Sequence, residues 1–132
     1  MVSKEVVEKI ICDFNVAKKE KGKLRKAREG KKLEPKDFEY TGKRKELLEY
    51  IKSLEKSDIS DICALMAYGR DCIKRGIESD DLKKYLDFRS DFEREDLGFP
   101  CYLMKIPDLN KCLRRALRLN VFKEVKDNEE NH

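Results

Sequence analysis

Histidine is almost absent from this sequence of 132 residues, because the only one is His132, the last residue. Histidine is the side chain that most often serves as a general base, as the partner of a nucleophile or as a zinc ligand. The sequence also lacks a glycine-rich phosphate-binding loop and the Glu-x-x-His pairs that hold two iron ions in helical bundles. We therefore expect a protein that is not an enzyme and that uses no metal ion or other cofactor.

Long uncharged runs are lacking as well. The longest, such as 97–104, are far shorter than the roughly 18 to 20 residues that cross a bilayer. The opening MVSKEVVEKII mixes acids with apolar residues, so we expect no signal peptide. The five cysteines form no Cys-x-x-Cys pair and most sit at apolar positions of the helical patterns, which favours reduced, buried thiols. These features predict a cytoplasmic protein that makes no contact with membranes.

Charge, in contrast, is abundant. Charged residues make up 44% of the chain, with 31 bases against 27 acids and a net charge of +4, whereas an average domain has about 25%. Apolar residues make up 39% and recur in clusters, which is typical of a small helical domain with charged outer faces. We expect a single helical domain over residues 1–120, followed by an acidic tail over 121–132.

Apolar residues recur at helical spacing along most of the chain. The pattern predicts helices from Ser3 to about 19, 43–56, 57–75 and from Ser79 onward, then a short helical turn at 101–105 and a last helix over 108–119. The third of these is apolar on nearly every side, which is typical of a central helix, and Gly76 should end it. No strand pattern is present, so the sequence predicts an all-α fold, a small bundle of about five helices.

A strongly basic run follows the first apolar pattern. Residues 18–32 contain nine bases and two acids, with Gly22 and Gly30 between them, and Pro35 and Gly42 follow. We expect a mobile basic linker over 18–42 after the first helix, or else an extension of that helix that frays.

The stretch Gly69-Arg70-Asp71 interrupts the most apolar helix and is the first candidate site. At 100° per residue Arg70 falls inside the apolar stripe, while Asp71 lies about 100° away from it. On the fourth helix Glu93 also falls in the apolar sector, so a buried Arg70–Glu93 pair would lock the two helices together. Gly69 suggests that another helix backbone approaches closely there. The alternative is an arginine that binds an anion in a cleft.

Basic residues provide the second candidate site. Four of them occupy the face of the last helix opposite its apolar stripe: Lys111, Arg114, Arg115 and Arg118. Four more lie in the basic run: Lys23, Arg25, Lys26 and Arg28. Together they suggest contacts with nucleic acid phosphates. The alternative is a solvated face, and no aromatic residues are interleaved to stack on bases.

Three stretches carry a resemblance: "ELLEYIKSL", "ICALMAYGRD" and "YLMKIPDLNKCLRRAL". In order and spacing they resemble an uncharacterised family of small bacterial helical proteins, which has an "ALxWLGRGD"-like helix and a "YLLGxPLL"-like C-terminal segment. The resemblance covers Glu46 to Leu117 and implies an all-helical fold without a known activity. The chain departs from that pattern at Cys72 and Lys105, where the family has glycine-containing motifs.

Two functions stay open at this point. The favoured one is a protein-interaction or regulatory module that binds a protein partner or associates with itself. The alternative is a nucleic-acid-associated protein that uses the basic linker and the basic face of the last helix. The first is favoured because acids nearly match the bases in number.

Overall fold

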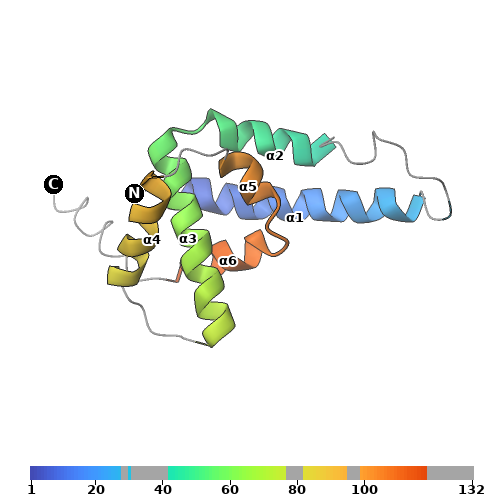
Figure 1. Cartoon of the computed structure of the whole chain (residues 1–132). Helices are drawn as coiled ribbons and strands as arrows, with labels where there is room; N and C mark the ends of the chain where they lie inside the picture. Colours follow the sequence, from blue (N-terminus) through green and yellow to red (C-terminus); the bar gives the residue numbers. More distant parts are fainter. Residues whose placement is uncertain (28–29, 31–41, 77–81, 95–98, 119–132) are drawn as a thin grey trace.

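The computed structural model describes residues 1–27, 30, 42–76, 82–94 and 99–118 (Figure 1). Within these residues it contains six helices and no strand. The helices are α1 (Lys4–Ala27), α2 (Gly42–Ser53), α3 (Lys56–Arg75), α4 (Leu82–Arg94), α5 (Phe99–Met104) and α6 (Leu109–Ala116). The predicted all-α fold is confirmed. The helix beyond the expected five is α5, which the sequence marked only as a short turn.

Helix α3 lies at the centre of the molecule, as its all-round apolar sequence predicts. Every residue from Ile59 to Gly69 is buried, and α4 and α6 pack against this helix. Helix α1 packs against α2 and α6, so the core is shared by the whole bundle. The largest fully buried side chains are Tyr68, Ile10, Leu47, Ile51, Ile62, Leu65, Met66, Leu103, Leu109 and Leu113. Burial of this apolar surface is the main source of stability.

The two glycines of α3 act as the sequence predicts. Gly76 ends the helix in the left-handed conformation, with φ at 63°, where a residue without a Cβ has no steric penalty. Gly69 faces the backbone of α6, and a Cβ built there would lie 2.9 Å from the carbonyl carbon of Cys112. Only glycine lets α3 and α6 approach this closely.

Helix α1 is longer than the sequence suggested. It continues to Ala27, so the predicted linker over 18–42 is wrong for residues 18–27, and the alternative of a helix extension holds there. Lysine, arginine, leucine and alanine are good helix formers, and one interior glycine, Gly22, costs only about 1 kcal/mol. At 1.5 Å per residue the helix is about 36 Å long. Its C-terminal end reaches past the other helices (Figure 1).

The projecting part of α1 also fixes the start of α2. The backbone N–H of Lys43 donates a hydrogen bond to Oε1 of Glu20, at 3.2 Å. A carboxylate at a helix N-terminus satisfies an otherwise unpaired donor and interacts favourably with the helix dipole. Gly42 has φ at 56°, and a Cβ on it would lie 3.0 Å from the Glu20 carboxyl carbon. The contact therefore requires glycine at this position.

Several predictions fall on residues that the structure does not describe. These are the linker beyond Ala27 apart from Gly30, the proposed start of α4 at Ser79, and the acidic tail over 121–132. Among the described residues, no helix combines the length and the apolar character needed to cross a membrane.

Two details of the predicted core are wrong. Helical spacing predicts an apolar stripe on α4 that contains Tyr85, Leu86 and Phe88, but Leu86 is 52% exposed. All five cysteines are free, but only Cys63, Cys72 and Cys112 are buried, and Cys12 is exposed. Cys12 lies on the outer face of α1, where no other helix covers it.

Candidate functional site

The predicted ion pair between Arg70 and Glu93 is not formed. Arg70 is exposed, and Glu93 is exposed and pairs with Arg89 on its own helix, with 3.5 Å between Arg89 Nη1 and Glu93 Oε1. The prediction of a buried Arg70 lock is therefore wrong.

The antiparallel packing of α3 and α4 explains the error. Lys84 near the start of α4 pairs with Asp71 near the end of α3, and Arg89 further along α4 pairs with Asp61 further back on α3. In this register Glu93 lies near the N-terminal end of α3. Arg70 is more than three turns away, about 20 Å along the helix axis. The helical wheel placed Arg70 and Glu93 in apolar sectors, but both are exposed, and Asp71, which the wheel placed outside the stripe, is the residue that meets α4.

Asp71 joins α3 to α4 at the far end of this interface. Its carboxylate pairs with Lys84 and, at 3.2 Å, with Arg75 on its own helix. The hydrogen bond from Lys84 is the main reason that the pKa of Asp71 is lowered from its ordinary value, and the charge of Arg75 adds to the effect. Asp71 is thus a partner in a link between helices.

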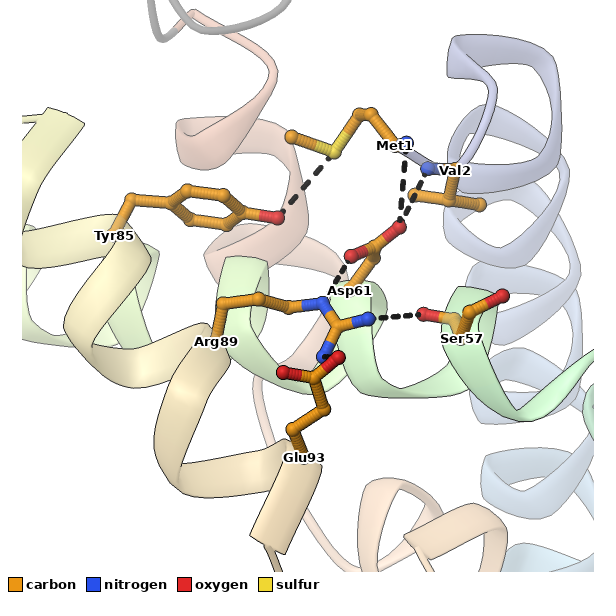
Figure 2. A network of polar contacts seen from close by, with 7 residues as sticks. All are labelled: Met1, Val2, Ser57, Asp61, Tyr85, Arg89 and Glu93. Atoms are coloured by element: carbon orange, nitrogen blue, oxygen red, sulfur yellow. Dashed lines mark hydrogen bonds and ion pairs between the residues drawn. The ribbon is translucent and has the colours of Figure 1, made fainter.

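The buried arginine lock exists, but with other residues. Asp61 is buried in α3, and its Oδ1 accepts a hydrogen bond from Nε of Arg89 on α4 (Figure 2). The side chains are 9% and 17% exposed, respectively. Arg89 also donates through Nη2 to the carbonyl oxygen of Ser57, at 3.4 Å. One arginine therefore joins α4 to two successive turns of α3.

The same aspartate holds the first residues of the chain. Its Oδ2 accepts a hydrogen bond from the backbone N–H of Val2 at 2.8 Å and lies 3.8 Å from the amino nitrogen of Met1. The hydroxyl of Tyr85 donates to Sδ of Met1 at 3.3 Å (Figure 2). Burial, with the charge of Asp61 as a second cause, raises the pKa of Tyr85, so the hydroxyl stays protonated as a donor.

The cluster of Asp61, Tyr85 and Arg89 is a polar network that holds three parts of the chain together. Its polar groups face one another from α3, α4 and the first residues of the chain. The carboxylate has an arginine and an amide as partners, which is how a folded protein accommodates a buried charge. The cluster therefore stabilises the packing of α3 against α4 and the first residues of the chain.

A groove of about 600 Å³ opens between the projecting half of α1, the start of α2 and the turn between α5 and α6. Its size falls within the range of small-molecule and peptide-binding sites. Its apolar lining consists of Phe14, Ala17, Met104, Ile106 and Pro107. Gly22 on α1 also lines it, and nothing lies within 4 Å of the position that a Cβ would take there.

Four cations surround this apolar lining: Lys18, Lys21, Arg44 and Lys105. The one acid among the lining residues is Asp108, which lies 3.9 Å from Nζ of Lys18. Both side chains of that pair are more than half exposed, so water screens their attraction. Lys21 and Arg44 also have interaction partners, so among the described residues the groove has an apolar floor and a charged, partly paired rim.

The sequence positions these walls in identifiable ways. The amide of Asn110 on α6 donates to Oδ1 of Asn15 on α1 at 2.6 Å, which fixes the two helices beside each other. The turn before α6 then brings Ile106 and Asp108 against the next turn of α1. The Glu20 contact described above places the first turn of α2 on the other side. The groove is the space between these two anchored walls.

The basic face of α6 is present. Lys111, Arg114 and Arg118 are exposed, and Arg115 is half-buried and has an interaction partner. Arg70 on α3 lies close enough to α6 that its charge opposes the effect of burial, which raises the pKa of the Cys112 thiol.

The other predicted cations lie on α1 or outside the described residues. Lys23, Arg25 and Lys26 lie in the last turns of α1, and Arg28 lies outside the described residues. Whether the two basic sets form one surface stays a prediction.

Most residues of the groove were missed from the sequence. Lys18 and Lys21 belong to the basic run, but nothing linked them to residues 104–108 or to Arg44. Asp61 left a clearer signal, because on the helical wheel it falls about 20° from Tyr68, in the apolar interior of α3. A carboxylate in that position has to be paired, and the search for its partner would have led to Arg89.

The chemistry of the groove suits binding. Its lining residues include no histidine, cysteine, serine or tyrosine, and only one carboxylate. Among the residues that the structure describes, no group of three or more histidine, cysteine, aspartate or glutamate side chains could hold a metal ion. An apolar floor with charges at its edge is the usual composition of a surface that recognises a ligand.

Comparison with known proteins finds no family model, no curated protein and no solved structure that matches this chain. The resemblance to a bacterial helical family therefore stays a prediction.

Proposed function

We propose that this protein is a non-enzymatic interaction module that binds a protein partner through the groove between α1, α2 and the α5–α6 turn. The observation that carries the proposal is a groove of about 600 Å³ whose described lining combines apolar side chains with four bases and one acid. Protein-binding surfaces commonly have an apolar centre and a polar, charged edge. The lining offers side chains for contact and few for acid–base or nucleophilic chemistry.

The experiment is a pull-down from a lysate of cells that make the protein naturally, with and without nuclease. The wild-type chain is compared with Gly22→Trp, which fills the groove, and with Gly22→Ala, which leaves it open. We expect a protein that is retained after nuclease by the wild type and by Gly22→Ala, and that Gly22→Trp loses. Retention that is equal for all three chains would move the binding surface away from the groove.

A second function has one observation in its favour. Residues 109–118 contain four bases and no acid, and three of those bases are exposed. Such a face attracts phosphates through charge and the release of counterions. In the same pull-down, a nuclease-sensitive signal that is lost on changing Lys111, Arg114 and Arg118 to Glu would support nucleic acid as the partner.

A further inference from the structure

We infer that two copies of this chain associate through the outer face of α1, with the two α1 helices antiparallel. The partner at this face is therefore a second copy of the chain. The inference goes beyond the proposed function, because this face lies on the opposite side of α1 from the groove. It follows from the exposure of the face, from its apolar middle and from the order of its charges.

The outer face of α1 carries a strip of side chains that the rest of the described structure leaves uncovered. Among the side chains described in α1, those within about 40° of Cys12 on a helical wheel form this outer strip: Glu5, Glu8, Cys12, Val16 and Lys19. All of them are exposed. Helices α2 and α6 pack against other sides of α1. The groove residues Phe14 and Lys21 lie about 160° to 180° from Cys12 on the wheel.

The middle of the outer strip is apolar. Val16 is 48% exposed, and Cys12, one turn before it, is also exposed. Valine is a poorer helix former than alanine or lysine, so helix formation does not explain its place on this turn. A second apolar surface laid against these two side chains would remove them from water.

The charges of the outer strip are ordered along the helix, with acids before the apolar middle and a lysine after it. In a parallel pair of α1 helices, like charges would face one another. In an antiparallel pair with its two-fold axis between Cys12 and Val16, each Val16 faces Cys12 of the second copy. Lys19 then lies about one residue, or about 1.5 Å along the axis, from the position opposite Glu8. The strip is therefore complementary to itself, as a two-fold interface requires.

These charges are available to a second copy. Among the residues that the structure describes, Glu5 and Lys19 form no ion pair, and Glu8 pairs with Lys4 at 3.9 Å. Both side chains of that pair are more than half exposed, so the pair contributes little to stability. Glu8 can exchange Lys4 for a lysine of the second copy at small cost.

The size of the strip sets the strength of the association. A contact between two single helices is smaller than the roughly 800 Å² per partner of a stable interface, so the dimer should be weak. We expect a dissociation constant of about 10 µM to about 100 µM at low salt. The groove of each copy stays open in this dimer, so the pair would bind a partner with two binding segments more tightly than one chain does.

The test is sedimentation equilibrium of the full chain from about 5 µM to about 500 µM, in about 0.05 M salt. We expect a change from monomer to dimer over this range. Lys19→Glu and Glu8→Lys each place like charges opposite one another, and each should raise the dissociation constant about tenfold or more. The double variant Glu8→Lys/Lys19→Glu restores opposite charges and should recover most of the affinity.

A matched control separates the strip from net charge. Lys74 is exposed on α3, and Lys74→Glu changes the net charge by the same amount as Lys19→Glu. It should leave the dissociation constant within about twofold. All these positions are exposed, and circular dichroism establishes that each variant is folded.

A disulfide tests the orientation of the two helices. In the antiparallel pair, Val16→Cys places a thiol opposite Cys12 of the second copy, within the roughly 7 Å between Cα atoms that a disulfide spans. Oxidised glutathione, which is reduced to two thiols as each protein disulfide forms, should therefore convert this variant to a covalent dimer. The wild type and Cys12→Ser/Val16→Cys should not be converted, because their equivalent thiols are about 6 Å apart along the axis as well as across the interface.

Three results would overturn the inference. These are a chain that stays monomeric up to about 500 µM, a dimer that is insensitive to Lys19→Glu or not recovered by the double charge exchange, and a covalent dimer of the wild type as abundant as that of Val16→Cys. The last result would indicate parallel helices. None of these variants changes a residue that lines the groove, so failure here leaves the proposed function intact. Loss of the groove partner would likewise leave the dimer intact.

Discussion

The α3–α4–α6 half of the molecule and the projecting half of α1 use charge in opposite ways. In the first, the buried carboxylate of Asp61 meets the arginine and amide that it needs, and the helices pack at van der Waals distance. In the second, four cations surround an apolar floor with one acid among them. Charges that are matched inside the protein hold it together, whereas the exposed ion pair of Lys18 and Asp108 at the edge of the groove contributes little to stability and can exchange partners.

Loss of the arginine in the matched half should have the largest effect. Arg89→Ala removes the cation that faces the buried Asp61 carboxylate, and we expect a loss of about 3 kcal/mol in the free energy of unfolding. Arg70→Ala is the control, because Arg70 is exposed, and it should change stability by less than about 0.5 kcal/mol. Urea unfolding measures both. Equal losses would mean that Arg70 has the buried role that the sequence first suggested.

Glycine to alanine substitutions should change the stability of the protein in opposite directions in the two halves. At Gly69 the new Cβ would lie 2.9 Å from the Cys112 carbonyl carbon, so α6 has to shift, at a cost of about 2 kcal/mol. At Gly22 the new methyl group meets nothing within 4 Å, and the better helix propensity should stabilise the protein by up to about 1 kcal/mol. Thermal unfolding distinguishes the two. A melting temperature lowered by Gly22→Ala would show that the groove is more closely packed than described.

The hydrogen bond from Lys43 to Glu20, which links α2 to α1, should contribute less to stability than the Asp61–Arg89 pair. Glu20→Ala removes the acceptor for the Lys43 N–H at the start of α2, and we expect a loss of about 1 kcal/mol. Glu20→Gln keeps an acceptor oxygen and should recover part of that loss. An effect as large as that of Arg89→Ala would contradict the view that this half is held by exposed contacts.

Thiol reactivity should differ between the buried core of α3 and the exposed surface of α1 without changing stability. Burial raises the pKa of Cys63 to about 12, and the thiolate is the reactive form, so Cys63 should resist alkylation near neutral pH. Cys12 on α1 is exposed and should react first. Mass spectrometry after brief treatment with iodoacetamide gives the order. Early labelling of Cys63 in the folded protein would show that α3 opens readily.

Sequence reasoning worked where the cause was local. The stop at Gly76, the central position of α3 and the close approach at Gly69 follow from one helix and its neighbouring residues. It failed where the answer depended on register between helices. The wheel placed Arg70 and Glu93 in apolar sectors, yet both are exposed, and only the antiparallel pairing of α3 with α4 shows that Arg89 meets Asp61. The groove combines residues 14–22, 44 and 104–108, and no local pattern joins these segments.

The most direct test of the central claim is the pull-down after nuclease treatment with the wild type, Gly22→Trp and Gly22→Ala. If the groove is the binding feature, the wild type and Gly22→Ala should retain the protein partner and Gly22→Trp should lose it. Retention by Gly22→Trp, with loss of the partner when Lys111, Arg114 and Arg118 are changed to Glu, would contradict the account and place the binding surface on the basic face of α6.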